Sequence, residues 1–390
     1  MKMPLLKLCI ISGSRAEYGL LFPLMQLIKH DKSVELQLIV TGMHLSPEFG
    51  LTYQQIERDG FSIHEKVEML LSGDTDTAII KATGLGMIGF ADAFRRLNPD
   101  WVILLGDRFE TFAAASAAHL SKIPVAHLHG GELTKGAADD AMRHAITKMA
   151  YLHFTSAKPY RKRVIQLGES PQRVFNVGAI GIDSIHALPL LNKKKLEKEM
   201  GFSFNKISIL VTYHPVTLEK KSAGQQMKNL LDALDHFPEV GIIFTLPNAD
   251  ADGRVIIELI KNYVIKNHHR AKAFPSLGQV KYLSTLQFVN AVVGNSSSGI
   301  IEAPCFKIPT VNIGDRQTGR IKPTSVIDTG TDVKSITAGI QKAFSKGFIS
   351  ASKKTTNPYG TGNTAPKILD RIKQVGKLSS IKKSFYDLTK

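Results

Sequence analysis

The order of apolar runs along the chain constrains the fold more than any other feature of the sequence. Short apolar runs typical of buried strands alternate with longer segments whose apolar residues recur at helical spacing. The first pair is Leu5–Ser12, expected to be a strand, and Tyr18–Lys29, expected to be a helix. Because strands that alternate with helices pair in parallel, this order predicts an α/β fold with a doubly wound parallel sheet.

The alternation occurs twice. The first series predicts further strands at Glu35–Thr41, Trp101–Leu105, Pro124–Leu128, Tyr151–Thr155 and Arg173–Asn176, and helices at Thr75–Leu97, Phe109–Leu120, Ala137–Ala150 and Lys158–Leu167. The second series predicts strands at Ile207–Thr212, Val240–Thr245, Ala271–Phe274, Ala291–Val293 and Thr310–Ile313. A length of 390 residues also exceeds what one hydrophobic core usually holds. The sequence therefore predicts two Rossmann-like domains that face each other across a cleft.

We expect the N-terminal domain at residues 1–178 and the C-terminal domain at 179–367. The stretch 178–198 contains glycines, a proline and a lysine run, so it is expected to cross between the domains. Residues 368–390 show a basic, helical pattern and are expected to pack back on the N-terminal domain.

Composition argues against several classes of protein. The net charge of +16 is scattered, with no basic stripe interleaved with aromatics and no nucleic-acid-binding motif, so we expect an anionic small-molecule ligand rather than nucleic acid. The two cysteines lie far apart in the sequence, which favours a reducing, cytoplasmic location. No apolar run is expected to span a membrane, and the N-terminus shows no signal-peptide pattern.

The stretch from Gly106 to Thr147 is dense in acid–base side chains. Asp107, His129 and Glu132 directly follow expected strands, so they are expected at the carboxyl edge of the sheet, where ligands bind in such folds. Asp139 and Arg143 are four residues apart on one expected helix and therefore share a face. This set of side chains predicts acid–base chemistry on an anionic substrate. Helix capping is the alternative for several of these carboxylates, and either Asp139 or Asp140 could be the functional member of that pair.

The second domain contains a candidate phosphate-binding loop, Gly294 to Gly299, rich in serine. A serine-rich helix cap would give the same pattern. Arg15, Arg108 and Arg316 each follow a strand-like run, and guanidinium groups favour a diphosphate ligand. The Gly-Lys-Ser/Thr ending of ATP-binding loops and the full glycine pattern of NAD-binding loops are both absent, so no such cofactor is expected.

A metal site is the competing hypothesis. His127 and His129 alternate along an expected strand, and Glu132 is the only near candidate for a third ligand. Because the spacing of a further ligand is missing, we expect no metal, and we expect a backbone-bonded imidazole for His127 rather than for His129. His44 and His214 each follow an expected strand and are candidate site residues.

At these residues the sequence resembles the UDP-N-acetylglucosamine 2-epimerases, most closely the hydrolysing branch of the sialic-acid pathway. The matching segments, which run in order over nearly the whole chain, are Ser12 to Tyr18, Gly106 to Glu110, Gly130 to Glu132, Asp139 to Lys148, His214 to Thr217, Pro247 to Asp250, Gly294 to Ser297, Glu302, and Gly314 to Gln317. The resemblance implies a fold like that of the two-domain B-type glycosyltransferases (GT-B) and a metal-independent reaction of a UDP-sugar with water, which gives UDP and the free 2-epimer. It also fits a homodimer or homotetramer.

The resemblance assigns roles position by position. Those implied for binding UDP are Arg15, Arg108, His214, Ser296, Ser297, Glu302 and Arg316, with Asn248, Ser276 and Leu277 near the nucleoside. Those implied for catalysis are the carboxylates Asp107 and Asp139, with Arg143, Glu132 and His44 nearby. His129 stands where family members that act on UDP-N-acetylglucosamine often have a catalytic glutamate, so it is expected to assist and to bear on the choice of sugar.

The main expectation is hydrolysis of UDP-N-acetylglucosamine to N-acetylmannosamine for sialic-type acid synthesis. The alternative is the same reaction on UDP-N,N'-diacetylbacillosamine, for legionaminic acid. A non-hydrolysing epimerase, a glycosyltransferase of this fold, a metal hydrolase and a non-catalytic nucleotide-sugar sensor are further alternatives.

Overall fold

The computed structural model describes residues 5–73, 75–133, 139–215, 222–247 and 253–388, which form two compact units. The N-terminal unit consists of Met1–Glu132, Asp139–Ala187 and Tyr359–Lys390, and the C-terminal unit consists of Leu188–Pro358 and Leu133. The chain therefore passes between units after Ala187 and after Pro358, whereas the sequence pattern places the boundaries at 178 and 367.

The N-terminal unit is built on a parallel sheet of seven strands in the order β3-β2-β1-β4-β5-β6-β7. The strands are β1 (Leu6–Ser12), β2 (Val34–Thr41), β3 (Glu65–Val67), β4 (Trp101–Leu105), β5 (Val125–Leu128), β6 (Leu152–Thr155) and β7 (Val174–Asn176). The strand order reverses between β1 and β4, and these two strands pair directly. Ligands of doubly wound sheets bind beyond the carboxyl ends of the strands at such a reversal.

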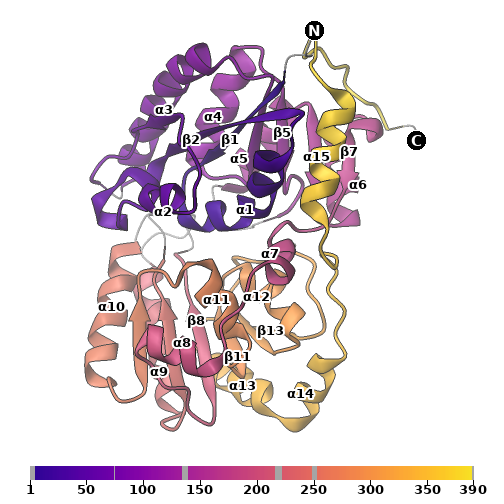
Figure 1. The fold of residues 1–390 in the computed structure, drawn as a ribbon. Helices are drawn as coiled ribbons and strands as arrows, with labels where there is room; N and C mark the ends of the chain where they lie inside the picture. The colour runs from indigo at the N-terminus through magenta and orange to yellow at the C-terminus, as the bar shows by residue number, and fades with distance from the viewer. Residues whose placement is uncertain (1–4, 74, 134–138, 216–221, 248–252, 389–390) are drawn as a thin grey trace. The chain divides into compact units, whose positions relative to one another are not determined.

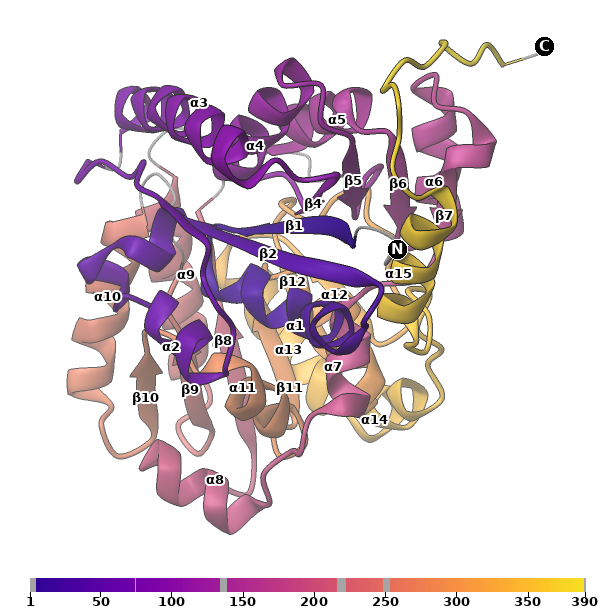
Figure 2. The ribbon, with the colours of Figure 1, turned by 45° about the horizontal axis from the view of Figure 1, so that its top comes forward.

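Helices cover both faces of this sheet because alternate strand residues are apolar on both sides. The helices are α1 (Arg15–His30), α2 (Tyr53–Arg58), α3 (Asp76–Leu97), α4 (Phe109–Leu120), α5 (Asp139–Met149), α6 (Lys158–Gln166), α7 (Gly181–Ala187) and α15 (Thr364–Val375). Leu8 and Ile10 of β1 pack in one core with α1 and α15, whereas Cys9 and Ile11 pack in another with α3 and α4. Figure 2 shows α3, α4 and α5 on one face of the sheet and α1 on the other.

A buried carboxylate attaches the C-terminal helix α15 to this unit, beside β7 in Figure 1. Asp183 of α7 accepts hydrogen bonds from the backbone nitrogen of Thr364, at 2.9 and 2.8 Å, and from that of Ala365, at 2.6 Å. Asn363, which precedes the helix, makes no side-chain cap. Asp183 therefore caps α15 from another helix, and its negative charge lies at the positive end of the helix dipole.

We expect Asp183→Ala to lower the free energy of unfolding by about 2–3 kcal/mol, because two helix N–H groups lose a charged acceptor. Urea denaturation followed by circular dichroism measures the loss. Asp370→Ala, which removes an exposed carboxylate of the same helix, is the matched control and should stay within about 0.5 kcal/mol of the wild type. Equal losses in the two variants would contradict the capping role.

The C-terminal unit repeats the architecture with a parallel sheet of six strands in the order β10-β9-β8-β11-β12-β13. The strands are β8 (Ser208–Thr212), β9 (Gly241–Thr245), β10 (Ala271–Phe274), β11 (Ala291–Gly294), β12 (Thr310–Ile313) and β13 (Val326–Thr329). The helices are α8 (Lys193–Met200), α9 (Ala223–Asp235), α10 (Gly253–Lys266), α11 (Gly278–Leu286), α12 (Ser298–Ile301), α13 (Val333–Phe344) and α14 (Lys346–Lys353). The order again reverses beside the first strand of the unit, between β8 and β11.

The predicted fold class, two Rossmann-like parallel-sheet domains, is confirmed, with local corrections. The expectation of a helical tail over 368–390 is wrong in part, because α15 ends at Val375, where Gly376 adopts a φ of 67°. Beyond it the chain is not helical, and the backbone nitrogen of Tyr386 donates to the carbonyl of Gly168 at 2.9 Å. The stretch 178–198, expected as a crossover, contains the helices α7 and most of α8.

One described helix, α3, is long and apolar enough to cross a membrane by length and composition alone. The expectation that no apolar run reaches that length is therefore wrong by this criterion. Phe90, Ala93 and Phe94 of this helix lie in the core formed with α4. A core helix passes the same test, so α3 is weak evidence for a membrane span.

Candidate active site

The acid–base residues of the N-terminal unit follow the ends of β4 and β5. Gly106 ends β4 with a φ of 81°, and Asp107 comes next. The side chain of Asp107 forms an ion pair with Arg143 of α5, whose guanidinium is 3% exposed. Pairing offsets part of the cost of burying the guanidinium. The pair brings together two residues predicted from sequence to share a site.

The first turn of α5 contains both candidate aspartates. Asp140 lies 3.6 Å from Nη1 of Arg143 and 3.7 Å from Nε2 of His144. Asp140 therefore belongs to the charged network of α5 itself. Asp139, one residue earlier, is partly exposed, as Asp140 is, and its role in contact with a substrate stays a prediction.

His129 follows β5 in an unusual backbone conformation, with a φ of 65°. Its Nδ1 lies 3.0 Å from Oε1 of Glu132, and its Nε2 accepts from the backbone nitrogen of Ile180 at 3.4 Å. An imidazole that accepts at Nε2 carries its proton on Nδ1, so His129 donates to Glu132 when it is neutral. Glu132 also accepts from Ser156 at 2.5 Å. Contacts at both nitrogens thus fix the orientation of the imidazole. Non-glycine residues at positive φ, of which His129 is one, cluster at functional sites.

Two other histidines near these strand ends are buried and neutral. His127 lies 2.8 Å from the carbonyl oxygen of Gly106 and 3.2 Å from the hydroxyl of Thr147, and burial lowers its pKa to about 3. The prediction that His127 bonds to the backbone is confirmed, but His129 also bonds to backbone, at the nitrogen of Ile180, which was not expected. His44 lies 2.9 Å from the hydroxyl of Ser12 and 2.7 Å from that of Thr52, and burial lowers its pKa to about 4. Both nitrogens of His44 are thus engaged within the protein.

Among the residues that the structure describes, no group of three or more His, Cys, Asp or Glu side chains could hold a metal ion.

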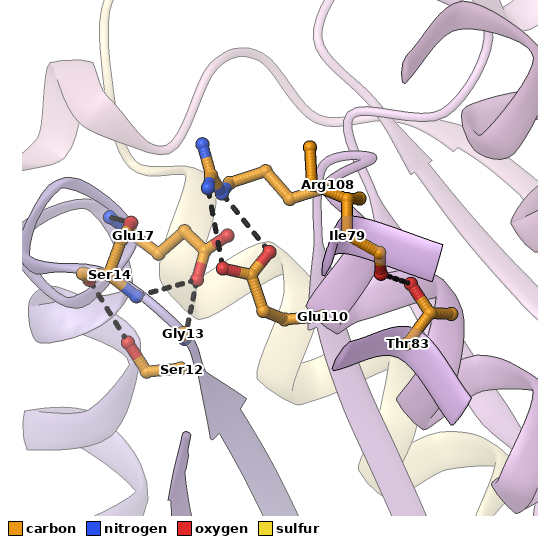
Figure 3. Close-up of polar contacts among 8 residues, drawn as sticks. All are labelled: Ser12, Gly13, Ser14, Glu17, Ile79, Thr83, Arg108 and Glu110. Carbon is orange, nitrogen blue, oxygen red and sulfur yellow. Dashed lines mark hydrogen bonds and ion pairs between the residues drawn. The ribbon is translucent and has the colours of Figure 1, made fainter. Parts of the chain in front are cut away.

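Arg15 and Arg108, the two arginines expected to bind UDP, lie beside the ends of β1 and β4. Arg15 opens α1, and burial lowers the pKa of its guanidinium from the usual value. Figure 3 shows Arg108 directed toward Glu110, with Glu17 of α1 beside them. Sequence analysis assigned no role to either glutamate. Ser14 and Glu17 form a capping box, so the pattern Ser-x-x-Glu was a sequence signal for Glu17 and for a helix that begins at Arg15.

In the C-terminal unit a buried asparagine joins the expected UDP-binding residues. Asn295, 0% exposed, accepts from the backbone nitrogen of His214 at 2.7 Å and donates to the carbonyl of His214 at 2.8 Å. Its own carbonyl accepts from Arg316 at 3.2 Å and from Gln317 at 2.8 Å. The turn after β8, the loop after β11 and the loop after β12 are thereby fixed to one another. Asn295 lies in the predicted serine-rich loop, but no role was predicted for it.

The remaining expected UDP-binding residues lie on the loops of the same unit. Ser296 and Ser297 are partly exposed ahead of α12, and Glu302 is buried just after it. Ser276 is exposed and accepts from the backbone nitrogen of Gly278 at 3.1 Å, and Leu277 is buried. Asn248 lies outside the described residues.

The sequence pattern of the family described as UDP-N-acetylglucosamine 2-epimerase matches residues 26–373. The chain therefore belongs to this family of enzymes, as its motifs predicted. The solved structure of UDP-GlcNAc 2-epimerase from Neisseria meningitidis bound to UDP-GlcNAc superimposes with a TM-score of 0.82 at 18% identity, over 95% of this chain and 100% of the other. That similarity supports the fold.

Three relatives are more informative about the branch of the family. The chain is 47% identical to the GDP/UDP-N,N'-diacetylbacillosamine 2-epimerase (hydrolyzing) of Campylobacter jejuni, over 88% of each chain. It is 38% identical to polysialic acid biosynthesis protein P7 of Escherichia coli, over 98% of this chain and 97% of the relative. It is 35% identical to the UDP-N,N'-diacetylbacillosamine 2-epimerase (hydrolyzing) of Legionella pneumophila, over 96% and 97%.

Proposed function

We propose that this protein is a hydrolysing 2-epimerase that converts UDP-N,N'-diacetylbacillosamine and water to UDP and 2,4-diacetamido-2,4,6-trideoxymannose. The assignment of this substrate is supported by the 47% identity, over 88% of each chain, to an enzyme named for this sugar. A second relative named for it is 35% identical. The main expectation from sequence, UDP-N-acetylglucosamine, has support mainly at the level of the family. The free sugar would enter the synthesis of a nonulosonic acid such as legionaminic acid.

The proposed reaction begins with loss of UDP from C1 and of the proton from C2, which leaves a 2-acetamidoglycal. Water then adds at C1, and a proton returns to C2 from the opposite face, so that C2 is inverted. The two faces of the sugar require two acid–base groups. We assign the removal of the proton to Asp107, which pairs with Arg143, and its return to Asp139. His129 and Glu132 assist as a hydrogen-bonded pair.

The leaving diphosphate carries negative charge that the protein must stabilise without a metal. Arg15, Arg108 and Arg316 are the proposed cations. His214, Ser296 and Ser297 are the proposed polar contacts. Asn295 joins His214 and Arg316 in one hydrogen-bonded network. Guanidinium groups supply bidentate donors that match phosphate oxygens.

The experiment follows UDP and free sugar by NMR with each of the two UDP-sugars, in the presence of a chelator. We expect a higher kcat/KM for UDP-N,N'-diacetylbacillosamine and release of its free 2-epimer. Preference for UDP-N-acetylglucosamine would contradict the proposed substrate. Absence of a free 2-epimer with both UDP-sugars would contradict the proposed reaction. A UDP-linked 2-epimer as product would instead indicate a non-hydrolysing epimerase.

His129 offers a test of sugar choice within the same site. We expect His129→Glu to lower the ratio of kcat/KM for the diacetylated sugar to kcat/KM for UDP-N-acetylglucosamine by about tenfold, about 1.4 kcal/mol. His127→Gln is the control, because His127 bonds to Gly106 inside the unit and should leave the ratio unchanged. An unchanged ratio in His129→Glu would remove His129 from sugar selection. The homodimer or homotetramer expected from the resemblance stays a prediction, which the mass of the protein in solution tests.

A further inference from the structure

Two buried carboxyl groups lie beside a single guanidinium where β1 and β4 end (Figure 3). Glu17 is in the first turn of α1 and is 9% exposed, and Glu110 is in the first turn of α4 and is 1% exposed. Arg108 lies just before α4, and its side chain is 14% exposed. Burial of a carboxylate is costly unless it is paired or protonated, so this cluster requires an explanation.

Glu110 holds the guanidinium of Arg108 in a forked contact. Nε of Arg108 donates to one carboxylate oxygen at 3.2 Å, and Nη2 donates to the other at 3.3 Å. The carboxylate is wedged against glycine backbone, because a Cβ built on Gly42 would lie 2.9 Å from Oε1 of Glu110 and one on Gly13 would lie 3.2 Å from its Cβ. Glu110 therefore orients Arg108 from the Nε–Nη2 edge of the guanidinium.

Glu17 binds the backbone of the adjacent loop. Its Oε2 accepts from the backbone nitrogen of Gly13 at 2.6 Å and from that of Ser14 at 3.2 Å. These N–H groups belong to the loop that leads into α1, where an anion would otherwise be bound. With a protein carboxyl group already there, side chains such as Arg108 have to bind the diphosphate at this edge.

The charges acting on Glu17 come from Glu110 and Arg108. Burial, and after it the charge of Glu110, raises the pKa of Glu17, whereas Arg108 and the loop N–H groups lower it; together they leave the pKa at about 7. Two charged groups on the helices packed against α1 pair elsewhere. Asp183 of α7 caps α15, and Lys373 of α15 pairs with Asp31 at the far end of α1.

A diphosphate bound to Arg108 would neutralise a cation that favours the ionised form of Glu17. We propose that Glu17 and Glu110 are positioning residues of the UDP site and that they couple UDP binding to the uptake of one proton by Glu17. This inference rests on the proposed UDP site. Glu110 keeps Arg108 in place, and the proton on Glu17 offsets the negative charge that arrives with UDP.

The sign of the effect follows from the charges. Below pH 7 Glu17 is already protonated, so UDP binding is accompanied by little uptake of protons. Above pH 7 the wild type must take up a proton on binding, and its affinity for UDP falls as pH rises. Glu17→Gln is uncharged at every pH, like protonated Glu17, and it keeps the capping box in its Ser-x-x-Gln form.

The experiment is isothermal titration calorimetry of UDP binding at pH 6.0 and 8.5, each in two buffers of different ionisation enthalpy. For the wild type at pH 8.5 we expect buffer-dependent heat equivalent to about half a proton or more. Glu17→Gln should abolish that uptake, bind UDP within about twofold of the wild type at pH 6.0, and bind about tenfold more tightly at pH 8.5. Glu110→Gln should reduce the uptake, because Glu17 then lacks its neighbouring negative charge.

Glu258→Gln, which alters an exposed carboxyl group of α10, is the matched control and should behave as the wild type. Uptake of equal size in Glu17→Gln, or none in the wild type at pH 8.5, would overturn the coupling and leave the proposed function intact. Should Glu17→Gln not fold, the pH dependence of the wild type alone decides. Failure of the wild type to bind UDP at either pH would overturn the proposed function itself.

Discussion

Replacement of Asp107 by asparagine should lower kcat for UDP release about 10²–10⁴-fold, the range expected when a general acid or base is lost. Asparagine keeps the size of the side chain and a hydrogen bond to Arg143, so the structure should persist while the proton acceptor disappears. Because Asp107 is not a proposed phosphate ligand, affinity for UDP should change far less than kcat. Continuous measurement of UDP release, together with calorimetry of UDP binding, separates the two effects.

Asp139→Asn should show a loss in the same range, and its neighbour supplies the control. Asp140 faces Arg143 and His144, so Asp140→Asn should disturb the network of α5 and lower kcat by less than about tenfold. If Asp140→Asn were the severe variant and Asp139→Asn the mild one, the roles of the two residues would be exchanged. Normal product formation by both Asp107→Asn and Asp139→Asn would exclude the two-carboxylate reaction.

The sequence predicted most of both sheets because their strands are buried on both faces and are therefore continuously apolar. β4 and β12, for example, have the expected bounds of Trp101–Leu105 and Thr310–Ile313. The strands β3 and β13 were not predicted. Glu65–Val67 and Val326–Thr329 lie at sheet edges, are short and include charged residues, so no apolar run marks them.

Ligands bind beyond the carboxyl ends of parallel strands, which predicted where the site residues lie but not what they contact. Asp107 and Arg143 were expected in one site, and they form an ion pair. His44 follows β2 as expected, yet Ser12 and Thr52 enclose it, which depends on how the loops pack. Contacts such as those of Asn295 and Asp183 join segments far apart in the sequence, and no local pattern records them.

Gly294 is the position in the C-terminal unit where a single methyl group should have the largest structural effect. It ends β11 with a φ of 133°, a conformation that favours glycine, between Thr212 of β8 and Asn312 of β12. A Cβ there would lie 1.9 Å from the carbonyl oxygen of Thr212, which belongs to the sheet backbone and has little room to move. Gly294→Ala must therefore shift the end of β11 relative to β8.

We expect Gly294→Ala to lower the free energy of unfolding by about 3 kcal/mol or more, from backbone strain together with the clash. The next residue is Asn295, which ties His214 and Arg316 together, so the variant should also weaken UDP binding about tenfold or more. Urea denaturation of the free protein and calorimetry with UDP measure the two losses.

Gly347→Ala is the matched control in the same unit. Gly347 lies in α14 with open space around its Cα, so alanine there should be neutral or stabilise the protein by about 0.5–1 kcal/mol through its helix propensity. If Gly294→Ala has the same free energy of unfolding as the wild type but binds UDP weakly, the loop alone is displaced. Full UDP affinity together with wild-type stability would contradict the role of Gly294, because a Cβ cannot be accommodated at that distance without movement of the loop that holds Asn295.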